Sequence, residues 1–159
     1  MKDLSNFSAA ERVESLKAGA VAAFGVFWGF GAIALANTFI LVPRFDFLAG
    51  LQVSAIDLNF AFKGSIALLA GFLFGVTYRY AIRTDTNPQL KSGVVLAFGL
   101  VRAFGQLDAG WFFEAGKLPV VQELLPFVVG SVESVVLFAI AGLVLDWAMG
   151  RSYIKRFDS

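Results

Sequence analysis

An uncharged run over residues 18–42 constrains this chain more than any other feature of its sequence. A helix needs about 20 consecutive apolar residues to cross the hydrocarbon core of a bilayer, and this run is long enough. Ser8 and Glu11 have the spacing of a capping box, which predicts that the helix begins near Ala9. Pro43 ends the helix because proline cannot continue it. We therefore predict a first membrane span between these limits.

Two further spans are predicted from helix start signals followed by apolar residues. Ser54 and Asp57 repeat the capping pattern, so we expect the second span to begin near Ala55. Asn87-Pro88 is typical of an N-cap followed by a first-turn proline. The third span follows it at about 93–107 and is the shortest of the set.

The fourth span is expected at about 126–149. Pro126 gives either its start or a kink, and Pro119 begins an earlier turn at the membrane interface. Hydrophobic residues make up 58% of the chain, above the roughly 45–50% of soluble domains. The fold class predicted is therefore all-α: a polytopic membrane four-helix bundle that forms one transmembrane domain over 1–159.

Lys and Arg are spread unevenly over the ends and loops of these spans. The first and third loops hold only Arg44 and Lys117. The two termini and the middle loop hold nine: Lys2, Arg12, Lys17, Arg79, Arg83, Lys91, Arg151, Lys155 and Arg156. Because loops rich in Lys and Arg stay on the cytoplasmic side, we expect both termini on the cytoplasmic, or stromal, side. A cleaved signal peptide ending at 34–36 is the alternative. The apolar region of a signal peptide is only about 7–15 residues long, and the uncharged run at 18–42 is longer than that.

Two segments of the chain resemble each other at an offset of 74 residues. Nine of 16 positions are identical between 16–31 and 90–105, and both segments open with Leu-Lys-x-Gly. The second and fourth spans match more weakly, with Gly-Ser-Ile at 64–66 against Gly-Ser-Val at 130–132. Chance similarity between apolar helices is the alternative to duplication.

The duplication hypothesis divides the domain into two helical hairpins, about 9–83 and about 88–151. Each hairpin starts on the same side, so the repeats are parallel and related by an axis along the membrane normal. The pairs Gly25-x-x-x-Gly29 and Gly71-x-x-x-Gly75 are typical of close helix packing. They predict packing within the chain, with a homo-oligomer interface as the alternative.

Three ionisable residues fall inside the predicted spans, where an unpaired charge costs several kcal/mol. They are Lys63, Arg102 and Glu133, and their distances from the span ends place them at similar depths. The repeat alignment shows that two of them are departures from the first hairpin. Arg102 stands where the first repeat has Trp28, and Glu133 stands where it has Ala67.

The matched depths suggest a mid-membrane polar site. In this hypothesis Arg102 and Glu133 form an ion pair between adjacent spans, Lys63 joins them, and Ser131 and Ser134 are hydrogen-bond partners. The pair either orients the helices without binding anything, or forms a site for a substrate, an ion or a lipid headgroup. A third alternative is that the span boundaries are misplaced and some of these residues lie at an interface.

The composition argues against several classes of function. There is no His and no Cys, which argues against disulfides, zinc sites and a haem held by His. No nucleophile arrangement, phosphate loop or carboxylate cluster occurs, so we expect neither an enzyme nor a cofactor. The net charge of +1 argues against a nucleic-acid partner.

The segment 11–19, Glu-Arg-Val-Glu-Ser-Leu-Lys-Ala-Gly, precedes a span rich in Ala, Phe and Gly. Together with the four-span layout, it is similar to a family of uncharacterised small membrane proteins of cyanobacteria and plastids. The resemblance implies a bacterial inner membrane or a thylakoid membrane. It supplies no catalytic residues.

Three function hypotheses follow. The first is a non-catalytic integral membrane protein that acts as an assembly factor, subunit or scaffold of a larger membrane complex. The second is a small transporter or channel, which requires a homo-oligomer because four helices seldom enclose a pathway alone. The third is binding of an apolar cofactor or lipid among the 18 Phe residues. The alternative is that these Phe residues simply face the lipid of the bilayer.

Overall fold

The computed structural model describes residues 9–53, 55–85, 87–110 and 121–157 of the chain, and these residues form helices and connections without any strand. The four long helices are α1 (Ala9–Ala36), α2 (Leu58–Ile82), α3 (Pro88–Gly110) and α4 (Val121–Gly150). Two short elements separate α1 from α2: the π-helix η1 (Asn37–Leu41) and the 3₁₀-helix η2 (Asp46–Leu51).

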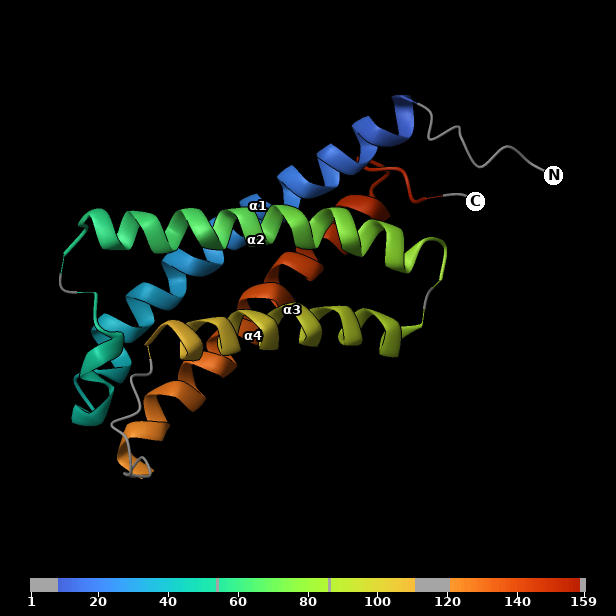
Figure 1. Ribbon diagram of the computed structural model, residues 1–159. Coiled ribbons are helices and arrows are strands. Elements are labelled where there is room, and N and C mark those ends of the chain that lie inside the picture. The colour runs from blue at the N-terminus through green and yellow to red at the C-terminus, as the bar shows by residue number, and fades with distance from the viewer. Residues whose placement is uncertain (1–8, 54, 86, 111–120, 158–159) are drawn as a thin grey trace.

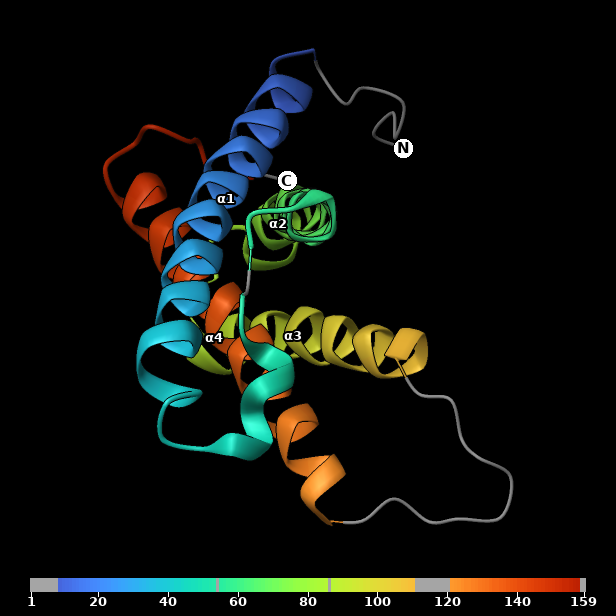
Figure 2. The ribbon, with the colours of Figure 1, turned by 90° about the vertical axis from the view of Figure 1, so that its left-hand side faces the viewer.

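Each long helix runs antiparallel to the next in sequence, and α1 and α4 cross α2 obliquely (Figure 1). α1 packs against α2 and α4, and α3 packs mainly against α4. Figure 2 shows α1 and α4 crossing steeply past α2, which is seen nearly end-on. We call the end with the start of α1, the α2–α3 connection and the last residues the terminal end. The loop end holds η1, η2, the start of α2, the end of α3 and the start of α4.

Three helical segments are long and apolar enough to cross a membrane: Ala9–Leu41, Leu58–Ile82 and Leu124–Gly150. They correspond to the first, second and fourth predicted spans, so membrane-spanning length and composition are confirmed for these three. α3 forms where the third span is predicted. It carries Lys91 and Arg102, and it is less apolar than the three segments that could cross a membrane. A fourth span and the duplicated hairpin stay predictions.

Two helix starts lie where the sequence predicts them. α1 begins at Ala9 and continues through the π turn η1 to Leu41, shortly before Pro43. α3 begins at Pro88, and the side chain of Asn87 accepts a hydrogen bond from the Gln89 amide at 2.9 Å. Local capping chemistry therefore determines the start of α3. For α1, Ser8 of the predicted capping box lies outside the described residues.

Two other starts differ from the prediction. α2 begins at Leu58 rather than near Ala55, because Asp57 is itself the N-cap and accepts a hydrogen bond from the Phe60 amide at 2.8 Å. α4 begins at Val121, so Pro126 lies inside the helix instead of starting it. Pro126 is the sixth residue of α4, past the four amides that lack a partner within the helix, so its missing N–H costs the helix one hydrogen bond.

The glycine pairs pack within the chain, as predicted. A Cβ on Gly71 would clash with Val26, and one on Gly75 would clash with the backbone of Ala18, so α2 approaches α1 closely. Gly25 lies against Ala141 of α4 in the same way. These contacts account for the small-residue pattern without a second copy of the chain.

An aromatic plug closes the centre of the molecule, formed by Phe74 of α2, Phe98 of α3 and Phe138 of α4. Their ring centroids lie 5.2–5.7 Å apart in all three pairs. Phe74 and Phe138 have no exposed surface. The plug separates the polar groups of the terminal end from those of the loop end.

Candidate functional site: a polar cavity at the loop end

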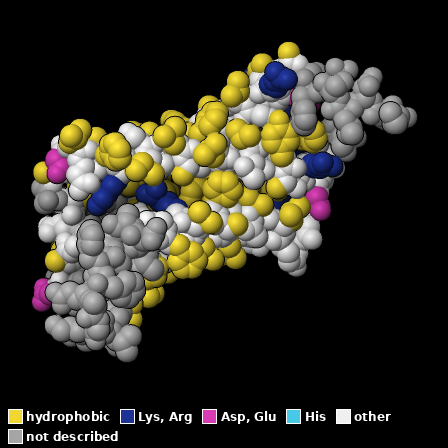
Figure 3. All heavy atoms as spheres, viewed as in Figure 1, with side chains coloured by type: hydrophobic (Ala, Val, Ile, Leu, Met, Phe, Trp, Pro, Cys, Tyr) yellow, Lys and Arg dark blue, Asp and Glu magenta, His cyan; other side chains and the backbone are white. Residues whose placement is uncertain are grey.

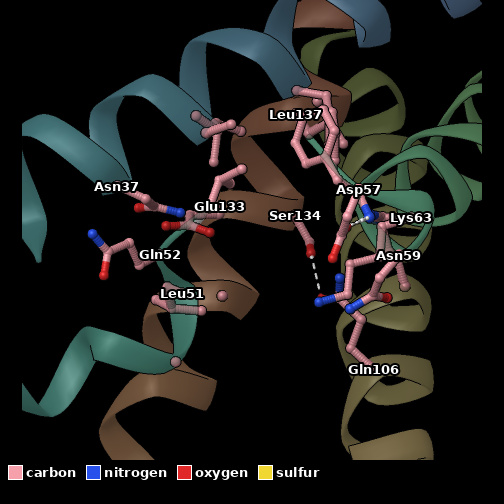
Figure 4. A pocket seen from close by; sticks show the side chains of 18 of the residues that line it. Asn37, Leu51, Gln52, Asp57, Asn59, Lys63, Gln106, Glu133, Ser134 and Leu137 are labelled. Carbon is pink, nitrogen blue, oxygen red and sulfur yellow. Dashed lines mark hydrogen bonds between the residues drawn. The ribbon is translucent and has the colours of Figure 1, made fainter. Parts of the chain in front are cut away.

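A cavity of about 190 Å³ lies at the loop end, between all four long helices and the segment 50–57. Apolar residues such as Phe30 and Leu137 form part of its wall. Its polar lining residues are Asn37, Gln52, Asp57, Asn59, Lys63, Arg102, Gln106, Glu133 and Ser134. Most of these side chains are labelled in Figure 4. A polar cavity in a protein of this composition is a candidate binding site.

Helical spacing brings each helix's polar residues to one face. Asn59 and Lys63 stand one turn apart at the start of α2, and Arg102 and Gln106 stand one turn apart on α3. Side chains four residues apart lie on the same side of a helix, so each pair faces the cavity together. The N-cap at Asp57 sets where α2 begins and therefore which α2 side chains reach the cavity.

Asn37 and Glu133 meet across the wall between η1 and α4. The Asn37 amide nitrogen points at the Glu133 carboxylate and is hydrogen-bonded to it (Figure 4). Asn37 is only 5% exposed. Asn37 Oδ1 and Glu133 Oε1 are both shielded from solvent and have no hydrogen-bond donor among the described residues. Buried acceptors of this kind are costly, so two acceptors here lack a donor that a ligand could supply.

Lys63 and Arg102 also line the cavity without a partner. Neither makes a hydrogen bond or an ion pair with any residue that the structure describes. The predicted ion pair between Arg102 and Glu133 is therefore wrong: these groups do not come within 4.0 Å of each other. The reason is that Glu133 turns toward Asn37 on the α1 side, whereas Arg102 belongs to α3.

The two predicted serines behave differently from each other. Ser134 lines the cavity, and its hydroxyl lies 3.4 Å from Oε1 of Gln106. Ser131 is not a cavity residue, because its hydroxyl donates to the carbonyl of Phe127 at 2.8 Å within α4. Four of the five predicted site residues thus converge on one cavity, and Ser131 does not.

The charges around the cavity balance in sign. Lys63 and Arg102 are basic, and Asp57 and Glu133 are acidic. Figure 3 shows basic side chains at the surface between α2 and α3, toward the loop end. A balanced set of this kind complements a group that carries both charges better than it complements a simple anion or cation.

Two cavity features were outside the reach of sequence reasoning. Gln52 lies in a loop, and it reaches the cavity because η2 folds back and buries Leu48, which is 1% exposed. Asn37, Asn59 and Gln106 are polar residues near the predicted span ends, and the sequence does not distinguish a cavity position from a span end for them.

At the terminal end, sequence reasoning missed a buried arginine. The Arg79 side chain is 0% exposed, and its Nη2 lies 2.6 Å from the Glu11 carboxylate. Its Nη1 donates to Ser15 Oγ at 2.8 Å, and its Nε donates to the carbonyl of Lys155 at 2.8 Å. Counting Arg79 as a residue of the positive loop hid its role of tying α1, α2 and the C-terminal segment together.

A second polar cluster lies between the plug and the terminal end. Lys91 of α3 forms an ion pair with Asp146 of α4 at 2.7 Å. The hydroxyl of Tyr78 donates to the other carboxylate oxygen of Asp146 at 3.1 Å. These charged groups have protein partners, unlike Lys63 and Arg102 of the cavity, which have none among the described residues.

No group of three metal-ligating carboxylates, imidazoles or thiols occurs in the described part of the chain. No family model, no curated protein and no solved structure matches this chain. The cavity and its lining residues are therefore the evidence that bears on function.

Proposed function

We propose that this chain is a non-catalytic integral membrane protein that binds a zwitterionic group in the loop-end cavity. The observation that carries the proposal is the convergence of unpaired groups of both signs on one space. Among the described residues, Lys63 and Arg102 have no acceptor, and Asn37 Oδ1 and Glu133 Oε1 have no donor. A ligand with a primary ammonium and an acidic group satisfies both sets.

A four-span topology supports this proposal. The strongly exposed side of α3 carries Leu96, Leu100, Val101 and Phe104, all of which suit contact with lipid. Its charged Arg102 instead lines the cavity. In this topology both termini lie on the cytoplasmic or stromal side, and the cavity opens on the opposite side of the membrane.

The test is equilibrium binding to the full chain in mild detergent. Phosphoethanolamine and glycine are the zwitterionic probes, and acetate and methylammonium are the singly charged comparators. We expect the zwitterions to bind about tenfold more tightly than either comparator, because each comparator leaves one set of groups unsatisfied. Equal binding of all four probes would contradict the proposal.

Variants locate the site. Arg102→Gln and Glu133→Gln should each weaken zwitterion binding about tenfold or more, because each removes one charged contact of the ligand. Arg44→Gln is the matched control: Arg44 is exposed, it bonds the Ile40 carbonyl, and it does not line the cavity. Unchanged binding in both cavity variants would place the ligand elsewhere.

A transporter is the second candidate function. Polar groups stand on both sides of the aromatic plug: the cavity on one side, and Lys91 with Asp146 on the other. Movement of the plug would connect them. Uptake of the bound zwitterion into proteoliposomes, faster in Phe74→Ala than in wild type, would support transport. Binding without uptake fits a subunit or assembly factor of a larger complex, which co-purification in mild detergent would identify.

A further inference from the structure

A second hollow lies on the outside of the molecule, between α1 and α2. It has a volume of about 510 Å³, and we call it the apolar groove. Phe27, Trp28 and Leu35 line it from α1, and each is more than half exposed. Gly64 and Leu68 line it from α2. In a membrane, this groove faces the acyl chains of the bilayer.

The groove exists because small residues stand where side chains could fill it. A Cβ on Gly31 would meet nothing within 4 Å, and one on Gly64 would meet only the Phe30 ring at 3.5 Å. The single hydroxyl in the lining, that of Ser65, is already bonded to the Ala61 carbonyl at 2.8 Å. The groove therefore has room for a hydrocarbon chain, and apart from this hydroxyl and the Trp28 indole its lining is apolar.

The groove and the polar cavity adjoin each other. Phe30 and Phe60 line both spaces, and their ring centroids are 5.3 Å apart. Along α1 the groove covers positions 26–35, whereas the cavity covers positions 30–37. The groove thus lies closer to the middle of the helix, and the cavity lies closer to the loop end. A polar space near one surface that borders an apolar space near the membrane centre matches the layout of a lipid.

We infer that the two spaces together bind one lipid molecule, with its zwitterionic headgroup in the cavity and an acyl chain in the groove. This inference rests on the proposed function, because the headgroup occupies the same cavity. The inference adds an acyl chain to the ligand, and it therefore assigns the ligand to a class: an amphiphile that comes from the bilayer.

The unpaired acceptors also select the headgroup. Asn37 Oδ1 and Glu133 Oε1 need N–H donors, which a primary ammonium has and a trimethylammonium lacks. Lys63 and Arg102 offer donors to a phosphate. The geometry therefore favours an ethanolamine phospholipid over a choline phospholipid with the same chains.

The experiment compares three probes on the full chain in mild detergent: dioleoyl phosphatidylethanolamine, dioleoyl phosphatidylcholine and free phosphoethanolamine. Native mass spectrometry gives the affinities. Quenching of Trp28 by a brominated acyl chain, in a Trp111→Phe, Trp147→Phe background, reports the position of the chain. We expect the ethanolamine lipid to bind at least about tenfold more tightly than phosphoethanolamine, since each buried methylene adds about fourfold. It should also bind at least about tenfold more tightly than the choline lipid, because a trimethylammonium has no N–H to donate.

The groove variant is Gly31→Leu, which fills the space for the chain. Its control is Gly105→Leu at the equivalent position of the aligned repeat, where a Cβ also meets nothing within 4 Å. We expect Gly31→Leu to weaken lipid binding about tenfold and to leave phosphoethanolamine binding unchanged, while Gly105→Leu changes neither.

The outcomes separate the two proposals. If phosphoethanolamine binds as tightly as the lipid, or if both leucine variants act alike, the lipid inference is overturned and the cavity site stands. If neither the lipid nor phosphoethanolamine depends on Arg102 and Glu133, the proposed function itself fails. Equal binding of the two lipids overturns the assignment of the headgroup.

Discussion

The two ends of this molecule treat buried polar groups in opposite ways. At the terminal end, the fully buried Arg79 has a bonding partner for each of its three guanidinium nitrogens. At the loop end, the half-buried Arg102 has none among the residues that the structure describes. Both arginines lie on long helices of the same chain, so the composition of the helices does not explain the difference.

This contrast separates a structural charge from one that is available to bind. Removing an ion from water is costly, and the cost is offset only by close partners. Glu11, Ser15 and the Lys155 carbonyl supply those partners for Arg79. Arg102 is only half-buried and bears a smaller cost, but no partner among the described residues offsets it, as expected where a ligand completes the set. The predictions below test whether the two ends differ in this way.

The largest effect is expected from Arg79→Met. The substitution leaves the Glu11 carboxylate and the Lys155 carbonyl without their buried partner, so stability should fall by about 3–5 kcal/mol. Unfolding by SDS in mixed micelles, followed by circular dichroism, measures the change. The control is Arg151→Met, because Arg151 is exposed and only stacks on Trp147 at 5.9 Å. Equal losses in the two variants would contradict a structural role for Arg79.

The next largest effect concerns the glycines of the α1–α2 contact. Gly75→Leu should cost about 1–3 kcal/mol, because its side chain would clash with Ala18 and Ala22 near the terminal end. Gly31→Leu, toward the loop end, should leave stability nearly unchanged because it points into the open groove. The same unfolding assay compares them. A destabilised Gly31→Leu variant would mean that the groove is closed in the folded protein.

A smaller effect is expected at the ion pair between Lys91 and Asp146. Their side chains are 27% and 30% exposed, so the pair is partly screened. A double-mutant cycle with Lys91→Met and Asp146→Asn should give a coupling of about 0.5–1 kcal/mol. A coupling near zero would mean that the ion pair between Lys91 and Asp146 does not stabilise the folded protein.

Much of the helical layout could be predicted because its signals are local. Asn87 caps the helix that starts at the very next residue, and Asp57 caps α2. Pro126 was consistent with either the start of the fourth span or a kink within it, and the structure has it inside α4.

The sequence predicted most of the residues that form the site, but it did not predict which of them contact each other. Lys63, Arg102 and Glu133 were identifiable because ionisable residues are rare in apolar segments. Which of them pair depends on the rotation of each helix, and that rotation turns Glu133 toward Asn37. The contact of Arg79 with the Lys155 carbonyl spans 76 positions of sequence, so no local pattern signals it.

The smallest effect is the most direct test of the contrast between the ends. In a double-mutant cycle with Arg102→Gln and Glu133→Gln, the two changes in stability should add to within about 0.5 kcal/mol, because the groups share no contact. Glu133→Gln alone should not destabilise the protein, since it removes a buried charge that has an unsatisfied oxygen. A coupling as large as that of Lys91 with Asp146 would mean that Arg102 and Glu133 form an ion pair in the folded protein. The loop end would then resemble the terminal end, and its charges would need no ligand.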